Sequence, residues 1–256
     1  MYHLGDIKTN KTYFYEYCDF LNSYQGKTIG ELIDILSSNI INFEFDTRNI
    51  NLKDKGYLGK LIKLTFFGLN FNENYNFQDK IINIRVCHLK KNKNNIISVK
   101  ERLTLSNIKK LDDITNSSSI EGLEIYPQIK DSFLFTVLTN TIKTTDDILN
   151  LKFMGINRIN FDNFDLKTKK KFQKDLDDIK KVINDKTFTS SGQKYLHIHK
   201  RGNKGTSSRA IGLKNTFLLE IIKKDLLKEK YKYSYYKKNK NEYNIFIEQN
   251  LLTIRN

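Results

Sequence analysis

Two neighbouring stretches decide the fold: residues 53–68, KDKGYLGKLIKLTFFG, and residues 72–108, NENYNFQDKIINIRVCHLKKNKNNIISVKERLTLSNI. In the first, apolar side chains recur at helical spacing and Gly68 follows them, which predicts a helix that starts at residue 56. In the second, apolar and polar residues alternate from Ile82 to His88, which predicts a strand. A polar turn over residues 90–95 then leads to a returning strand over residues 96–106.

The rest of the chain predicts further helices and strands in alternation. Residues 13–21 read as a helix, and Thr28 with Glu31 forms a capping box for a second helix. The other expected elements are strands over residues 43–45, 133–139, 148–156 and 195–199, a turn over 144–147, a loop over 201–211, helices over 168–183 and 215–227, and a strand or arm from 231. The pattern predicts an α/β protein, a single domain over residues 1–256 with helices flanking a mixed β-sheet.

The 256-residue chain is basic, with 44 Lys and Arg against 29 Asp and Glu and a formal charge of +15. No run approaches the roughly 18–20 apolar residues that a membrane span needs, so we expect no membrane partner. The first residues lack the basic flank and apolar core of a secretory signal. Two cysteines cannot build a disulfide framework and fit a reducing compartment, so we expect a cytoplasmic protein.

The positive charge is concentrated in the C-terminal half. Residues 1–150 carry 19 basic and 18 acidic side chains, whereas residues 151–256 carry 25 and 11. Within residues 194–240 the counts are 14 and 3, on a Gly- and Ser-rich loop that runs into a helix. Such a region favours double-stranded DNA as the partner, with a plain solvated surface as the alternative. The residues expected to bind DNA are His199, Lys200, Arg201, Lys204, Ser207, Arg209 and Lys214.

Two histidine motifs are candidates for a metal or catalytic site. His197 and His199 share one face of a strand, but no acidic or Cys residue follows at a ligand-like spacing. Cys87 and His88 point to opposite faces of their strand, which argues against a nucleophilic dyad. We therefore expect no metal and no cofactor in this chain.

Several short motifs follow one another in a fixed order. Residues 55–62 read K-G-x-x-G-x-L-I before F-G at 67–68, residues 89–91 read L-K-K, and residues 100–105 read K-E-R-L-x-L. FLFTVL and LHIHKRG follow downstream. The ordered set resembles the mismatch-repair nicking endonuclease MutH and the GATC-cutting type II restriction enzymes, over roughly residues 30–227. The resemblance implies a restriction-endonuclease-like fold, a GATC duplex as substrate, and Mg²⁺ at the catalytic site.

The chain departs from this family at its catalytic positions. The family holds Mg²⁺ with an Asp, a Glu in E-x-K and a Glu on the early helix, and its Lys assists the attacking water. The corresponding residues here are Asn76, Asn83, Lys63 and Arg85. An amide has no formal charge with which to hold a divalent cation, and two amides with two cations leave the site without negative ligands, so we expect a degenerate site without a catalytic residue.

The larger restriction enzymes of this family resemble a tandem of two such folds, the second of which has lost catalysis and acts as a DNA-binding, allosteric half. The chain looks like that second half, as a fragment or a separate subunit, with a catalytic partner that carries the Mg²⁺. One alternative is an active Mg²⁺-dependent endonuclease whose carboxylates have migrated to Asp79 or Glu73. Another is an RNA-binding protein that shares only the fold.

Overall fold

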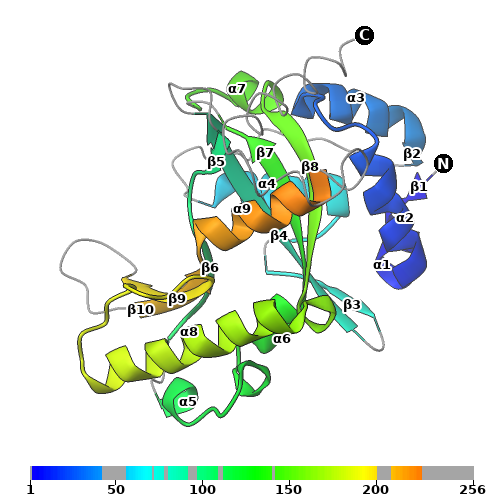
Figure 1. The fold of residues 1–256 in the computed structure, drawn as a ribbon. Helices are drawn as coiled ribbons and strands as arrows, with labels where there is room; N and C mark the ends of the chain where they lie inside the picture. Colours follow the sequence, from blue (N-terminus) through cyan, green and yellow to red (C-terminus); the bar gives the residue numbers. More distant parts are fainter. Residues whose placement is uncertain are drawn as a thin grey trace. The chain divides into compact units, whose positions relative to one another are not determined.

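A computed structural model describes residues 2–41, 56–70, 72–77, 80–91, 97–108, 112–139, 142–200 and 209–226. Helices and strands alternate along the chain, and the strands form both parallel and antiparallel pairs (Figure 1). The predicted α/β class, with mixed sheets flanked by helices, is confirmed. The contacts divide the chain into two compact units: Met1–Ser98 with Phe133–Asn157 and Lys224–Asn256, and Val99–Ser132 with Arg158–Lys223. Strands β7 and β8 run through both units, and the prediction of a single domain over residues 1–256 stays a prediction.

The first unit begins with a group of short helices. These elements are β1 (Tyr2–His3), α1 (Leu4–Thr9), α2 (Lys11–Asn22), α3 (Ile29–Asn39) and β2 (Ile40–Ile41). The predicted capping box is present: Thr28 Oγ1 accepts from the Glu31 backbone N–H at 3.1 Å, and the Thr28 N–H donates to Glu31 Oε2 at 2.7 Å. This exchange satisfies two N–H groups that have no partner inside the helix, and so it sets where α3 begins.

The main sheet of this unit follows. Its strands are β3 (Tyr75–Phe77), β4 (Lys80–Lys91), β7 (Asp131–Leu138) and β8 (Lys152–Asn160) in the order β3-β4-β7-β8, and β5 (Ile97–Val99) also pairs with β4. Helix α4 (Tyr57–Phe67) precedes them and ends at Gly68, whose left-handed φ of 59° favours glycine. Helices α2 to α4 bury one apolar cluster against the sheet, and its largest fully buried rings include Phe14, Phe66, Phe67, Phe135 and Phe153.

The second unit is built around the long helix α8 (Leu166–Asn184). Its other elements are β6 (Leu103–Asn107), α5 (Asp112–Thr115), η1 (Ile120–Gly122), α6 (Tyr126–Lys130), η2 (Phe161–Asn163), β9 (Leu196–Lys200), β10 (Arg209–Leu213) and most of α9 (Asn215–Leu226). The sheet order is β6-β10-β9, and α8 runs beside β9 (Figure 1). The predicted inward residues of α8, Phe172, Leu176, Ile179 and Ile183, are all buried. Phe172 packs edge-on against Phe217 of α9 with ring centroids 5.0 Å apart.

Three sequence predictions were wrong in detail. The stretch 96–106 is not one strand: β5 and β6 belong to different sheets, and exposed Lys100 and Glu101 separate them. The expected turn over 144–147 and strand over 148–156 are instead helix α7 (Thr145–Leu149) followed by β8, because Thr144 and Asp147 form a second capping box. The end of the expected loop over 201–211 is strand β10.

The predicted strand over 43–45 and the arm from residue 231 lie outside the described residues, as does the loop segment 201–208. Within the part of the chain that the structure describes, no helix combines the length and the apolar character that a membrane crossing requires.

Candidate functional site

Helix α4 carries the first residue of the candidate site, Lys63. The helix buries most of its length, and Lys63 is only 6% exposed, although it is charged. Its ammonium group donates a hydrogen bond to the backbone carbonyl of Glu73, in the segment that leads into β3. A buried lysine is uncommon in proteins and is normally paired or hydrogen-bonded. Lys63 therefore makes this part of α4 a candidate functional site.

The β3–β4 hairpin supplies the other three residues that the resemblance places at the catalytic site. Asn76 lies directly opposite Ile81 in the antiparallel register. Because side chains alternate along a strand, Asn76, Asn83 and Arg85 all belong to one face of the hairpin. Asn83 is 4% exposed and Arg85 is partly buried, whereas Asn76 near the turn is exposed. These three residues of neighbouring strands thus lie on one face of the hairpin.

The electrostatics connect this hairpin face to α4. Burial, and then repulsion from the Arg85 guanidinium, lower the pKa of Lys63 to about 8, and attraction from Glu73 only partly opposes them. Burial also lowers the pKa of Arg85. Lys63 on α4 and Arg85 on β4 are thus coupled electrostatically, and Asn76 and Asn83 share a face of the hairpin with Arg85.

The described side chains at this place do not suit a divalent cation. Mg²⁺ is normally held by carboxylates, and the four positions offer two amides and two cations. Glu73, one of the two carboxylates considered as migrated ligands, accepts hydrogen bonds from the Asn70 backbone N–H at 2.8 Å and from Asn70 Nδ2 at 2.7 Å. Throughout the described residues, no three His, Cys, Asp or Glu side chains meet as a possible metal site. The other candidate carboxylate, Asp79, lies outside them.

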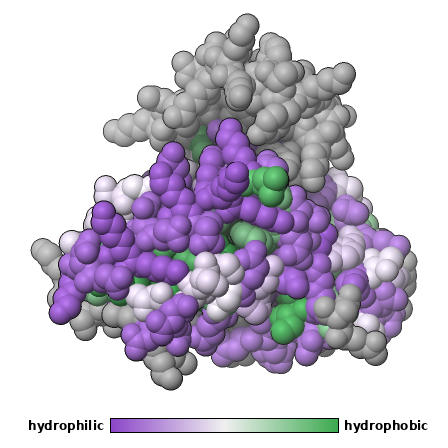
Figure 2. Space-filling view, turned by 60° about the horizontal axis from the view of Figure 1, so that its bottom comes forward, coloured by the Kyte–Doolittle hydropathy of each residue, from purple (hydrophilic) through white to green (hydrophobic). Residues whose placement is uncertain are grey.

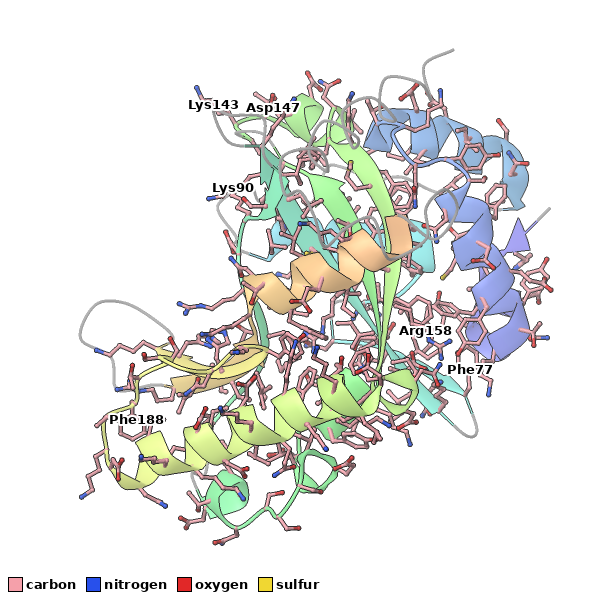
Figure 3. The ribbon with its side chains drawn as sticks, viewed as in Figure 1. Phe77, Lys90, Lys143, Asp147, Arg158 and Phe188 are labelled. Atoms are coloured by element: carbon pink, nitrogen blue, oxygen red, sulfur yellow. The ribbon has the colours of Figure 1, made fainter. Side chains whose placement is uncertain are left out.

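The predicted DNA interface maps to the β9–β10 pair in the second unit. Lys200 ends β9 and Arg209 begins β10, and the two residues face each other in the antiparallel register. The guanidinium of Arg209 lies 4.8 Å from the ring centroid of Phe188, which is labelled in Figure 3, and this contact orients the Arg209 side chain. Lys200 and Arg209 thus flank the basic loop. Arg201, Lys204 and Ser207 belong to that loop, outside the described residues.

Two other residues of the predicted interface have partners within the protein. Lys214 Nζ donates to the backbone carbonyls of Ser190, at 2.9 Å, and Gln193, so its charge stabilises the segment before β9. His199 is 6% exposed, and its ring stacks on that of His197 with centroids 4.8 Å apart. A side chain that contacts base edges must be accessible from solvent. The Lys214 ammonium group is bound to two carbonyls and His199 is buried, so neither is available for such a contact. Among the described residues of the predicted interface, exposed Lys200 and half-buried Arg209 therefore remain available to contact DNA.

Sequence reasoning missed Asp175, which positions the start of this hairpin. Asp175 lies on α8, is 2% exposed, and accepts backbone N–H bonds from Lys194, Tyr195 and Leu196 at 2.7, 2.6 and 2.9 Å. The sequence did contain a signal for this role. Asp175 lies between the inward residues Phe172 and Leu176 of α8, where an acidic side chain must find buried hydrogen-bond partners.

Helix α8 also shows that part of the positive charge is ordinary surface. Its exposed residues include Lys167, Lys170, Lys174 and Lys181, interrupted by the exposed Asp177. By contrast, Lys169 and Lys180 each donate to a backbone carbonyl. Figure 2 shows that the side of the molecule at the bottom of Figure 1 is predominantly hydrophilic. A mixed Lys and Asp face of this kind is typical of a solvated helix, so the charge excess does not by itself locate the interface.

The described residues therefore offer two features: the buried side chains of Lys63 on α4 and Asn83 on β4, with Arg85 nearby in sequence on β4, and a basic hairpin end at Lys200 and Arg209. The two features lie in different units and each is defined by its own contacts. No protein-family model matches the chain, and no curated protein matches it either.

Proposed function

We propose that this protein is a DNA-binding effector domain or subunit of a type II restriction endonuclease. It has a restriction-endonuclease-like, MutH-like fold, recognises a short duplex site of sequence GATC in the cytoplasm, and does not cleave DNA itself. Cleavage belongs to a catalytic partner or second half that carries the Mg²⁺, and this chain is a pseudonuclease that acts on it allosterically.

One observation carries the proposal. Lys63, Asn76, Asn83 and Arg85, which occupy the family's catalytic positions in the sequence, come from a helix and from one face of the hairpin that follows it. The electrostatic coupling of Lys63 to Arg85 supports a relation between the helix position and the strand position. The loss of all three carboxylates, with Arg85 in place of the family's Lys, is what a non-cleaving role requires.

The basic hairpin supports the choice of partner. Lys200 and Arg209 flank the ends of a loop that contains Arg201, Lys204 and Ser207. Cationic side chains interleaved with hydroxyls suit the phosphate backbone of a duplex, and the planar guanidinium of an Arg can bond guanine O6 and N7 together. The hairpin is therefore the proposed site of DNA contact, with an Arg as the reader of the base sequence.

The test combines cleavage and binding. The full chain is incubated with Mg²⁺ and a GATC duplex, and separately titrated with that duplex, a scrambled duplex and single-stranded RNA at two salt concentrations. We expect no Mg²⁺-dependent cleavage and tighter binding of the GATC duplex than of either competitor. Cleavage that Asp79→Ala or Glu73→Ala abolishes would establish an active nuclease instead. Preference for the RNA would establish an RNA-binding protein, and equal affinity for both duplexes would refute the GATC assignment.

A further inference from the structure

The connection between α8 and β9 contains an aromatic residue in an unusual backbone conformation. Phe188, labelled in Figure 3 where the chain leaves α8, has a left-handed φ of 48°, and Lys186 has a φ of 56°. Such angles crowd the Cβ of any residue except glycine and are rare for a bulky side chain. A strained residue of this kind persists only where the surrounding structure holds it, and in proteins it often marks a functional position.

Hydrogen bonds on both sides of Phe188 hold it in this conformation. On the helix side, the Phe188 backbone N–H donates to the Val182 carbonyl at 3.2 Å. On the strand side, Gln193 Nε2 donates to the Thr189 carbonyl at 3.0 Å, and the Ile198 N–H donates to Gln193 Oε1 at 3.0 Å. The turn is thus tied both to the end of α8 and to strand β9, and these bonds fix where the Phe188 ring lies.

The Phe188 ring contacts the side chain of Arg209, the first residue of β10. The guanidinium carbon of Arg209 lies over the ring, 4.8 Å from its centroid. Phe188 is partly exposed, and Arg209 is half-buried at the end of the hairpin, where Lys200 faces it in the antiparallel register. A guanidinium that packs through its flat face uses none of its five N–H donors in that contact, because these donors lie in its plane. The ring therefore orients the plane in which Arg209 donates hydrogen bonds.

We propose that Phe188 is a positioning residue for Arg209, and that this pair makes Arg209 the residue that reads guanine in the target duplex. The inference rests on the proposed function, which it deepens by naming the reader and the residue that orients it. A guanidinium that bonds guanine O6 and N7 together must lie close to the plane of the base. An Arg that is held in one plane before binding loses less conformational freedom on contact, so it discriminates between bases more strongly than a mobile one.

The experiment titrates the full chain with the GATC duplex and with a scrambled duplex at the same salt concentration, and the ratio of the two affinities measures the preference. Phe188→Leu and Phe188→Gly remove the aromatic face, whereas Phe188→Tyr keeps it. Lys186→Gly is the matched control, because it relieves a left-handed φ two residues away and removes no ring. Arg209→Ala, alone and combined with Phe188→Leu, tests whether Phe188 acts through Arg209.

We expect the wild type to prefer the GATC duplex by about 10-fold or more. Phe188→Leu and Phe188→Gly should each reduce this preference about 3- to 10-fold, because Arg209 is then free to rotate, and Phe188→Tyr and Lys186→Gly should keep it. Phe188→Gly also relieves the left-handed φ, so its unfolding midpoint should stay within about 3 °C of the wild type. In the Arg209→Ala background, Phe188→Leu should change the preference by less than about 2-fold.

The outcomes separate the inference from the proposed function. A preference that Phe188→Leu leaves unchanged, or lowers equally with and without Arg209, would overturn the positioning role while DNA recognition stands. A preference that Lys186→Gly lowers as much as Phe188→Gly would assign the effect to the backbone of the turn, which also overturns the inference. Equal affinity of the wild type for both duplexes would instead refute the recognition of GATC, and the reading of guanine by Arg209 with it.

Discussion

The Asp175 carboxylate lies 2.6 Å from the backbone nitrogen of Tyr195, and through this bond α8 holds the residue that immediately precedes β9. The neighbouring N–H groups of Lys194 and Leu196 donate to the same carboxylate. A charged side chain that satisfies three backbone donors fixes the strand more firmly than apolar contact alone. The proposed DNA-binding hairpin therefore depends on a residue that does not face DNA.

Replacement of Asp175 by Asn should lower the free energy of unfolding by about 1.5–3 kcal/mol, because the amide offers one acceptor oxygen where three donors converge. Urea unfolding monitored by circular dichroism measures the change. Asp177→Asn on the exposed side of the same helix is the control and should alter stability by less than about 0.5 kcal/mol. Equal effects of the two substitutions would show that the bonds to Asp175 contribute little.

Acid should destabilise the protein through His197. Burial, and then the neighbouring His199, Arg102 and Lys214, lower its pKa to about 3 from an ordinary value of 6.5. The unfolded chain therefore takes up the proton more readily, so stability is full above pH 6.5 and is lost as the pH falls toward 3. We expect His197 to account for a loss of about 2 kcal/mol between pH 7.5 and pH 5.

His197→Leu isolates this effect, since the other titrating groups remain. Within the described residues neither ring nitrogen of His197 has a hydrogen-bond partner, so the substitution sacrifices no such bond. Urea unfolding at pH 7.5 and pH 5 should give a variant that loses about 2 kcal/mol less than the wild type over this interval. The same loss in both proteins would exclude His197 as the group responsible.

The two thiols should be inert in the native protein. Cys18 and Cys87 are buried thiols outside any disulfide, and burial raises the pKa of Cys87 to about 12. Because only the thiolate reacts, iodoacetamide at pH 8 should label neither residue until denaturant is added. Mass spectrometry of the native and the denatured protein provides the measurement. Rapid labelling of Cys87 in the native state would show that β4 opens to solvent there.

DNA binding should depend on the basic hairpin and not on total charge. Replacing Arg201, Lys204 and Arg209 together with Ala should weaken duplex binding by more than about 10-fold and reduce the salt slope by about 2 to 3, at about 0.9 for each lost phosphate contact. The control triple, Lys8, Lys11 and Lys27, removes the same number of charges from the N-terminal region. If both triples weaken binding equally, the hairpin is not the interface and the duplex is held by diffuse charge.

A base reader should be distinguishable from a phosphate contact within the same hairpin. Either Arg201→Ala or Arg209→Ala should erase the preference for GATC over a scrambled duplex, worth about 1–3 kcal/mol, whereas Lys237, Lys238 and Lys240 replaced by Ala should weaken both duplexes alike. Paired titrations at two salt concentrations measure the difference. A preference that survives both Arg substitutions would assign base reading to other residues.

The sequence by itself determined the elements whose signal is local. The apolar spacing of α4 and α8 and the alternation of β4 predict those elements because period and burial are properties of single segments. The capping box at Thr28 is equally local, since the side chain bonds the backbone three residues on. The sequence also contains the capping box of Thr144 and Asp147, but the helix that it starts is too short to show a helical period of apolar residues.

Only the tertiary structure decided which strands pair and which charges are internal. Residues 96–106 alternate as one strand would, yet β5 pairs with β4 and β6 with β10, because pairing depends on partners elsewhere in the chain and not on the local pattern. Lys63 and Lys214 are indistinguishable in sequence from solvated charges, and their surroundings in the fold make both of them donors to backbone carbonyls. A charge acquires its role from the dielectric and the partners around it, which local sequence does not specify.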